Sequence, residues 1–160
     1  MTVSHELFRK AWGQFPTGVS VITSRRNDGQ FYCTTANAIS SVSLDPFLVL
    51  VSIAKGGNTY QHLKREGYFG INLLREDQAE MAKLFAGPGS DSQRAIPAGH
   101  HVRSTGTALL DDALAAMDCH MVQEHDAGDH TLFIAEVQHL EVKSGSPLVF
   151  FEGRYTSLTS

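Results

Sequence analysis

Cysteine is scarce in this chain of 160 residues, which contains only Cys33 and Cys119. Their wide separation lacks the CxxC spacing of a zinc knuckle or a redox pair. We therefore predict that both are small buried hydrophobic residues. Long hydrophobic runs are also missing, because the longest, residues 47–51, is far too short to cross a bilayer. This absence argues against a membrane protein.

An excess of positive charge is absent as well. The 13 Lys and Arg against 17 Asp and Glu give a formal net charge of −4, which offers no electrostatic surface to nucleic acid or an anionic membrane. Neither a GxGxxG fingerprint nor a P-loop occurs, so nothing indicates a Rossmann or Walker site. The eight histidines are scattered, and the adjacent His100 and His101 would point to opposite faces of a strand. That arrangement disfavours a shared metal site.

The composition that remains is typical of one globular domain spanning residues 1–160. Hydrophobic residues make up 42% of the chain and charged residues 19%, which is enough for a single core. No repeat or linker divides the chain, and only residues 87–99, rich in Gly, Pro, Ser and Asp, read as a surface loop. The first ten residues show no secretory signal, which favours a cytoplasmic protein.

Periodicity and capping residues predict short helices at residues 6–12, 59–66 and 75–86. Ser4 caps the first, which is amphipathic and ends at Gly13. Asn58 caps the second, whose left-handed end is Gly67. The third helix stops at Gly87 because Gly-Pro cannot continue it.

Runs rich in β-branched and aromatic residues predict strands between these helices. They cover residues 17–24, 30–37, 47–53, 68–74, 102–110, 118–124, 130–142 and 147–155. The first two form a hairpin around residues 27–29, and residues 126–129 join another pair. Residues 47–53 read as a fully buried strand introduced by Asp45-Pro46.

This element list predicts a mainly β fold with short helices, of the α+β class. Six or seven of these strands would form a closed or nearly closed antiparallel barrel. Parallel βαβ winding is disfavoured because most connections are too short for crossovers.

Three polar stretches could carry chemistry. Residues 34–43 combine hydroxyl and amide side chains with small apolar ones, as the edge of a flavin site requires, but an ordinary edge strand turning into a loop has the same composition. Residues 52–59 run from a strand through Lys55-Gly56-Gly57 into a helix, which suits a phosphate or simply a capped helix.

The third stretch, residues 128–131, is a turn that leads into a long strand. His130 could hydrogen-bond a carboxamide there, with Asp129 orienting its ring. A histidine after a turn is more often a plain surface residue, and nothing in the spacing supports a Ser/His/Asp or Cys/His constellation.

Taken in order along the chain, these stretches and several flanking motifs resemble the short-chain flavin reductase family, the reductase components of two-component flavin monooxygenases. The motifs that carry the resemblance are Phe15-Pro16-Thr17-Gly18-Val19, Thr35-Ala36-Asn37, Ser40-Ser41-Val42-Ser43-Leu44-Asp45-Pro46, Tyr68-Phe69-Gly70-Ile71-Asn72, Phe85-Ala86-Gly87, Gly128-Asp129-His130-Thr131 and Gly153-Arg154-Tyr155. The match runs nearly from end to end.

The resemblance implies an FMN-binding split β-barrel of antiparallel Greek-key type that forms a homodimer. It implies FMN or FAD as the flavin and NADH or NADPH as the hydride donor, with His130 as the catalytic residue that orients the nicotinamide. The implied flavin contacts are Thr34, Thr35, Ala36, Asn37, Ser40, Ser41, Ser52, Ile53, Ala54, Lys55, Asn58, Thr59 and Phe85, and the implied nicotinamide contacts are His130 and Tyr155.

By the same analogy, the reduced flavin would pass to a separate monooxygenase. Two alternatives remain at this point. A flavin carrier would bind the cofactor but reduce it slowly, and a purely structural barrel would bind none. A metal-dependent enzyme is disfavoured because no dense cluster of ligands occurs.

Overall fold

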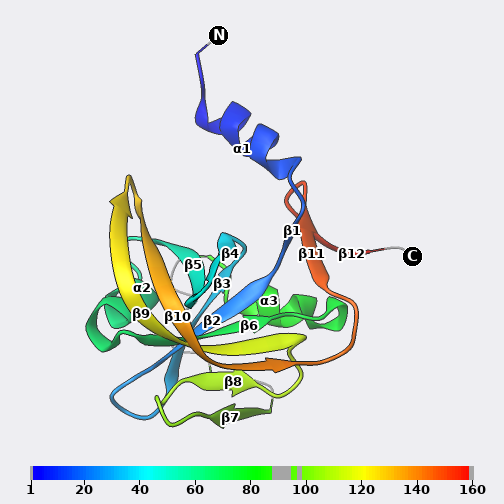
Figure 1. Ribbon diagram of the computed structural model, residues 1–160. Coiled ribbons are helices and arrows are strands. Elements are labelled where there is room, and N and C mark those ends of the chain that lie inside the picture. The colour runs from blue at the N-terminus through cyan, green and yellow to red at the C-terminus, as the bar shows by residue number, and fades with distance from the viewer. Residues whose placement is uncertain (1, 88–94, 97–98, 159–160) are drawn as a thin grey trace.

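A computed structural model describes residues 2–87, 95–96 and 99–158 (Figure 1). Most of the predicted loop at residues 87–99 therefore lies outside the described residues. The elements in chain order are α1 (His5–Gly13), β1 (Thr17–Gly18), β2 (Ser20–Arg25), β3 (Phe31–Ala36), β4 (Ile39–Leu44), β5 (Phe47–Ala54), α2 (Asn58–Glu66), β6 (Tyr68–Leu73), η1 (Glu76–Gln78), α3 (Ala79–Leu84), β7 (His100–Val102), β8 (Ala108–Leu110), β9 (Ala115–Ala127), β10 (His130–Val142), β11 (Leu148–Phe151) and β12 (Arg154–Ser157).

The central feature is a seven-stranded antiparallel sheet with strand order β3-β2-β6-β9-β10-β5-β4. Its two edge strands, β3 and β4, are consecutive in the chain and joined only by Asn37 and Ala38. The sheet must therefore curl until its edges approach each other. Beside the junction, the Ser52 amide donates to the Ala38 carbonyl at 2.9 Å, which extends the pairing of β4 with β5 by one residue. The predicted mainly β class with short helices and the antiparallel pairing of the strands are confirmed.

Alternating side chains divide the buried residues between the two faces of this sheet. Ile22, Phe69 and Phe133 belong to one cluster, which Tyr60 and Leu63 of α2 complete. Val21 and Leu109 belong to the other, which α3, β8 and β11 cover. Both faces are thus packed, one by α2 and the other by α3, β8 and β11.

The predicted ends of the first two helices agree with the structure except at the start of α2. The Ser4 hydroxyl accepts the Leu7 amide at 3.1 Å, as predicted for the cap of α1. Gly67 ends α2 with φ of 70°, as predicted. The assignment of Asn58 as the α2 cap is wrong, because Gly57 holds the cap position and Asn58 is the first helical residue. Helix α2 thus begins one residue earlier than predicted, because glycine is well tolerated at a cap position.

Two predicted strands are hairpins instead. Residues 102–110 divide into β7 and β8, which are joined by a turn in which Gly106 has φ of 89° and its amide donates to the Arg103 carbonyl. Residues 147–155 divide into β11 and β12 around Glu152 and Gly153, both with positive φ. Positive φ at both central residues is the geometry of a tight two-residue hairpin turn. The third predicted helix also divides, into η1 and α3.

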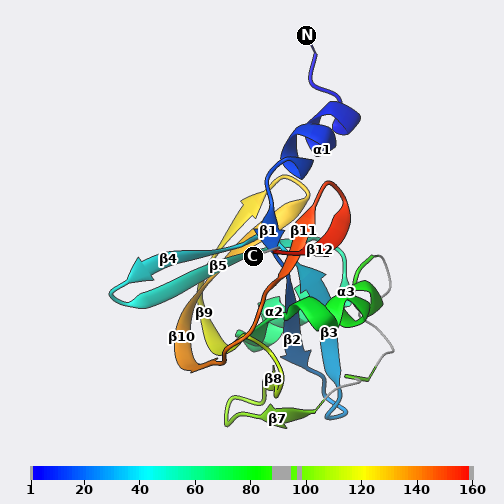
Figure 2. The same cartoon turned by 90° about the vertical axis from the view of Figure 1, so that its right-hand side faces the viewer.

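The strand β5 is not fully buried, contrary to its apolar sequence. Phe47 is exposed and Leu48 to Leu50 are only half buried, because this half of β5 pairs with the edge strand β4 in a hairpin that extends from the body (Figure 2). The missed strand β4 is the other half of that hairpin. We call residues 39–54 the β4–β5 arm.

The predicted burial of the two cysteines is confirmed, since Cys33 and Cys119 are both buried free thiols. Burial raises the pKa of each thiol to about 12, which makes them unreactive. Within the described ranges, no helix is long and apolar enough to span a membrane.

Candidate functional site

A cavity of about 660 Å³ lies where the ends of β3 and β5 meet the start of α2. The curl of the sheet brings these segments together, because β3 is one edge strand, β5 lies next to the other edge strand β4, and Asn37-Ala38 connects β3 to β4. Its walls are formed by Thr34, Thr35, Ala36, Asn37, Ala38, Ser52, Ile53, Ala54, Lys55, Gly56, Gly57, Thr59, Tyr60, Gly87 and His130.

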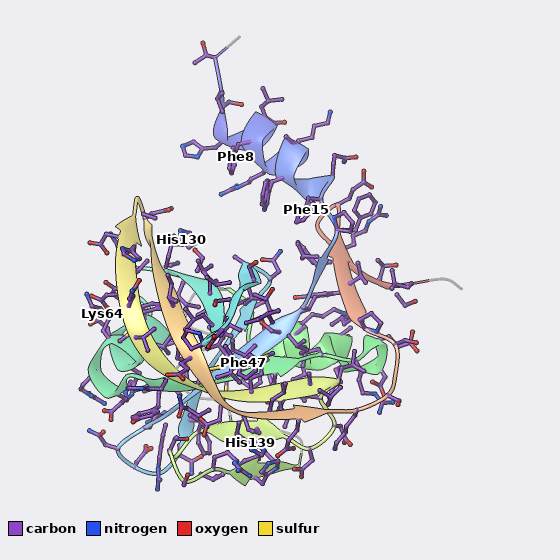
Figure 3. All side chains as sticks on the ribbon, viewed as in Figure 1. Phe8, Phe15, Phe47, Lys64, His130 and His139 are labelled. Atoms are coloured by element: carbon purple, nitrogen blue, oxygen red, sulfur yellow. The ribbon has the colours of Figure 1, made fainter. Side chains whose placement is uncertain are left out.

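His130 reaches the cavity through strand register. It is the first residue of β10 and lies opposite Ala54 at the end of β5. Its Nδ1 donates to the Asp129 carboxylate at 2.7 Å, and this hydrogen bond lowers the pKa of Asp129. The bond fixes the ring and leaves Nε2 without a partner among the described residues. Figure 3 labels His130 near the tip of the β9–β10 ribbon.

Lys55 ties the cavity wall to that ribbon. Its ammonium donates to the Gly128 carbonyl at 3.0 Å and lies 3.3 Å from the Asp126 carboxylate. Asp126 also accepts the Thr131 hydroxyl, and this bond, followed by the Lys55 interaction, lowers the pKa of Asp126. Lys55 therefore holds the turn before His130 in place, and its charge remains beside the cavity.

Several polar atoms of the walls have no protein partner. Within the described residues, this holds for the hydroxyls of Thr34 and Ser52 and for the amides of Gly56 and Gly57. Thr35 differs, because its hydroxyl donates to the Ala82 carbonyl at 2.7 Å. A cavity with apolar walls and unpartnered donors and acceptors fits the ring edge of a bound flavin. The amides next to the N-terminus of α2 fit a phosphate.

A second cavity, about 170 Å³, adjoins the first. Thr35 and Asn37 line both, and Tyr155 and Phe150 lie on its far side. The two rings are 5.4 Å apart, and burial raises the pKa of the Tyr155 hydroxyl. His130 and Tyr155 thus lie on opposite sides of Thr35 and Asn37.

The structure brings most of the predicted site residues together. Those that line the main cavity are Thr34, Thr35, Ala36, Asn37, Ser52, Ile53, Ala54, Lys55, Thr59 and His130. Five lie elsewhere. Ser40 and Ser41 are on β4, Asn58 begins α2, Tyr155 lines the second cavity, and Phe85 is buried in the core.

The list of implied contact residues left out five residues of the cavity wall. Ala38, Gly56 and Gly57 adjoin residues that it identified, and the Gly-Gly pair was a visible sign of close backbone approach. Gly87 and Tyr60 carried no such indication, since Tyr60 looks like any apolar residue on the buried side of a helix.

Comparisons with known proteins point in the same direction as the cavity. The sequence matches the flavin reductase like domain over residues 12–159. An NADH-dependent flavin reductase from a Rhodococcus species is 39% identical over 94% of this chain and 84% of its own length. The reductase component of a 4-nitrophenol 4-monooxygenase/4-nitrocatechol 2-monooxygenase from Rhodococcus opacus is 36% identical, over 92% of this chain and 78% of its own.

A solved structure shows the same likeness. A flavin reductase in its native state superposes with a TM-score of 0.89 at 39% identity, covering 99% of this chain and 100% of the other.

Proposed function

The chain belongs to the flavin reductase like domain family, and from that premise we propose which of its residues bind flavin and nicotinamide. It is an NAD(P)H-dependent flavin reductase, of the class that supplies reduced flavin to a separate monooxygenase. A flavin held in the cavity would supply the acceptor for the hydride of the nicotinamide, so the protein needs no nucleophile of its own. Its residues bind and orient the two reactants.

The observation that supports the flavin site best is the set of unpartnered polar atoms in the main cavity. Thr34 and Ser52 would contact the polar edge of the ring, with Ala36 and Ile53 beside its apolar part. The amides of Gly56 and Gly57, together with Asn58, Thr59 and Lys55, would hold the phosphate. For Ser40, Ser41 and Phe85 the assignment continues to rest on the family resemblance.

The nicotinamide would lie between His130 and Tyr155. With Nδ1 held by Asp129, His130 Nε2 is the ring nitrogen available to a carboxamide. Orientation of this kind accelerates transfer by bringing the donor carbon and the flavin acceptor atom within about 3–3.5 Å. We propose NADH as the donor because the Rhodococcus relative is named as NADH-dependent, with either FMN or FAD as the acceptor.

Three further proposals complete the function. The enzyme works as a homodimer, it delivers reduced flavin to a monooxygenase of its own pathway, and it acts in the cytoplasm. Two free thiols and no disulfide among the described residues are compatible with a reducing compartment.

The first experiment measures initial rates of NADH and NADPH oxidation with FMN, FAD or no added flavin. We expect rapid NADH oxidation that saturates with one flavin. His130→Ala should raise the KM for NADH and lower kcat by about 10–100-fold, a loss on the scale that follows from poor orientation. His125→Ala, which removes an exposed histidine of the same ribbon, is the matched control. Tight flavin binding without turnover would instead favour the carrier.

A second experiment addresses the phosphate site. The double variant Asn58→Ala/Thr59→Ala should bind FMN at least about tenfold more weakly, because each lost charge-assisted hydrogen bond costs about 1.5–3 kcal/mol. Flavin fluorescence titration gives the dissociation constant, and circular dichroism checks the fold. An unchanged constant in a folded variant would refute this assignment.

A further inference from the structure

Lys55 lies between the part of the cavity proposed for the flavin phosphate and the turn that carries His130. Ala54 is opposite His130 in the β5–β10 ladder, so the next residue leaves the strand directly beside that turn. The backbone amide of Lys55 donates to the Asp129 carbonyl at 2.9 Å, and its ammonium donates to the Gly128 carbonyl at 3.0 Å. One residue thus holds both central residues of the turn.

Asp126 fixes the position of that ammonium group. The Asp126 carboxylate lies 3.3 Å from the Lys55 ammonium and accepts the Thr131 hydroxyl at 3.0 Å. Asp126 and Thr131 are opposite each other in the β9–β10 ladder, one position beyond the pair that closes the turn. Thr131 is fully buried, so its hydroxyl anchors a carboxylate whose own side chain is 72% exposed. Asp126 therefore joins Lys55 to the rigid part of the ribbon.

The Lys55 ammonium can serve both reactant sites at once. An ammonium group has three N–H donors. Among the described residues, Asp126 and Gly128 engage two of them, and Lys55 also lines the main cavity. The third donor is the one that a flavin phosphate in this cavity would engage. The phosphate and the turn would then be held by the same group.

Sharing one flexible side chain couples the two sites energetically. Lysine has a flexible four-carbon stem, so holding its ammonium in one place costs conformational entropy. The exposed pair of Lys55 with Asp126 contributes little by itself. A phosphate that fixed the ammonium would already meet the entropy cost, and the contacts of Lys55 with Asp126 and Gly128 would then hold the turn more firmly. Cooperativity of this kind arises when one ligand orders a group that the second ligand also needs ordered.

We propose that Asp126 is a positioning residue that acts through Lys55, so that binding of the flavin phosphate steadies the turn that orients His130 at the nicotinamide. This inference deepens the proposed function and rests on its assignment of Lys55 to the phosphate and of His130 to the nicotinamide. By reciprocity, each reactant strengthens the binding of the other by the same factor. Riboflavin has the same ring as FMN but no phosphate, and it should lack this effect.

Riboflavin and FMN therefore give a direct test. NAD⁺ replaces NADH, so that calorimetry measures its binding without turnover. The quantity compared is a ratio, the dissociation constant of NAD⁺ with saturating riboflavin divided by that with saturating FMN. Asp126→Ala should lower this ratio by about two- to fivefold, the scale of an exposed ion pair. The same variant should leave the dissociation constant of riboflavin itself unchanged.

Glu124→Ala is the matched control. Glu124 lies on the same strand β9 and pairs with Lys64 of α2 at 3.0 Å, so this variant also removes a lysine ion pair from the ribbon. Because that pair involves neither Lys55 nor the turn, the ratio should keep its wild-type value. Equal ratios in Asp126→Ala and Glu124→Ala would overturn the proposal.

Hydrogen–deuterium exchange measures the turn directly, without any nicotinamide. In the wild type, FMN should slow exchange of the amides of residues 127–131 more than riboflavin does. In Asp126→Ala the two flavins should protect these amides equally. Greater protection by FMN that persists in Asp126→Ala would show that the phosphate acts on the turn by another route, and it would overturn the proposal.

Asp126→Asn separates positioning from a purely structural role. Its amide oxygen can still accept the Thr131 hydroxyl, whereas the charge that holds Lys55 is gone. We expect this variant to unfold near the wild-type temperature and still to show the lowered NAD⁺ ratio. A ratio that falls in Asp126→Ala but stays at the wild-type value in Asp126→Asn would assign Asp126 to stability alone.

Failure of the proposed function would give a different result. Equal affinity of the wild type for FMN and riboflavin would show that the cavity gains nothing from a phosphate at Lys55, and both proposals would fall. Tighter binding of FMN than of riboflavin, with an NAD⁺ ratio that does not respond to Asp126→Ala, would overturn the positioning role of Asp126 alone.

Discussion

Gly70 shows how a single residue controls the packing of this fold. A Cβ atom at this position would lie 2.4 Å from the Thr23 hydroxyl and 2.8 Å from the Ala108 carbonyl. Thr23 already donates to Ala108 at 2.6 Å, so neither neighbour can easily give way. The glycine is required because β6 passes directly against that buried hydrogen bond.

We therefore expect Gly70→Ala to lower the free energy of unfolding by about 1–3 kcal/mol, the usual cost of overpacking. Gly18→Ala is the matched control, since a Cβ there meets nothing within 4 Å, and it should change stability by less than about 0.5 kcal/mol. Urea unfolding of both variants measures the difference. Equal stabilities would contradict the steric argument.

At the scale of elements, a charged network joins three segments, which are β7, the residue that follows β8, and β10. His101 lies 2.8 Å from the Asp111 carboxylate and 3.0 Å from that of Glu141. His139 lies 3.1 Å from Glu141, and Arg103 is nearby. The Asp111 hydrogen bond, with Glu141 adding to it, raises the pKa of His101 above 6.5 despite the opposing effect of burial. Protonated His101 is therefore favoured in the folded state.

This network predicts a pH-dependent contribution to stability. The pKa of His101 is higher in the folded state than in the unfolded state. The stabilisation that His101 provides is therefore complete at pH values below its unfolded-state pKa, and it is lost as the pH rises through its folded-state pKa. His101→Asn should cost about 0.2–1 kcal/mol, the range for exposed ion pairs, at a pH about one unit below 6.5. Thermal unfolding measured over a range of pH should show that the unfolding temperatures of wild type and variant converge above neutral pH. A difference that stays constant with pH would contradict the prediction.

At the scale of the whole molecule, flavin binding and dimerisation should be linked. The β4–β5 arm ends in the cavity wall, and a second copy that packed against this arm would hold the wall in place. Ligand and partner then stabilise the same arrangement, and by reciprocity each must strengthen the binding of the other by the same factor.

Leu44 is 82% exposed on the arm, and Leu140 is an exposed leucine at the far end of β10. We expect Leu44→Glu to bind flavin several-fold more weakly than Leu140→Glu, and saturating flavin to lower the dimer dissociation constant of the wild type. Coupling free energies of about 1–3 kcal/mol correspond to factors of about 5–150. Flavin titration of the two variants measures the flavin affinity, and sedimentation of the wild type with and without flavin measures the dimer dissociation constant. Flavin affinity independent of the oligomeric state would show that the cavity is complete in one copy.

Local chemistry explains why much of this fold could be predicted from the sequence. Backbone preferences act over a few residues, so Ser4 and Gly67 mark helix ends and the bounds of β10 were predicted to the residue. Turns were harder, since Glu152-Gly153 and Gly106 are short signals inside apolar runs that otherwise read as single strands. The helical residues of α2 were also correct to within one position.

The composition of the candidate site could be predicted partly from the sequence. Residues 34–37 and 52–55 are recognisable there because small and polar side chains stand next to apolar strands. Their meeting in one cavity with His130 depends on strand register and on the curl of the sheet, which pair residues distant in the chain. Phe85 shows the limit, since only tertiary packing places it in the core. The sequence by itself thus determined the elements and the chemical character of the site, through short-range backbone and side-chain preferences, whereas only the tertiary structure decided which segments meet and which apolar surfaces stay uncovered.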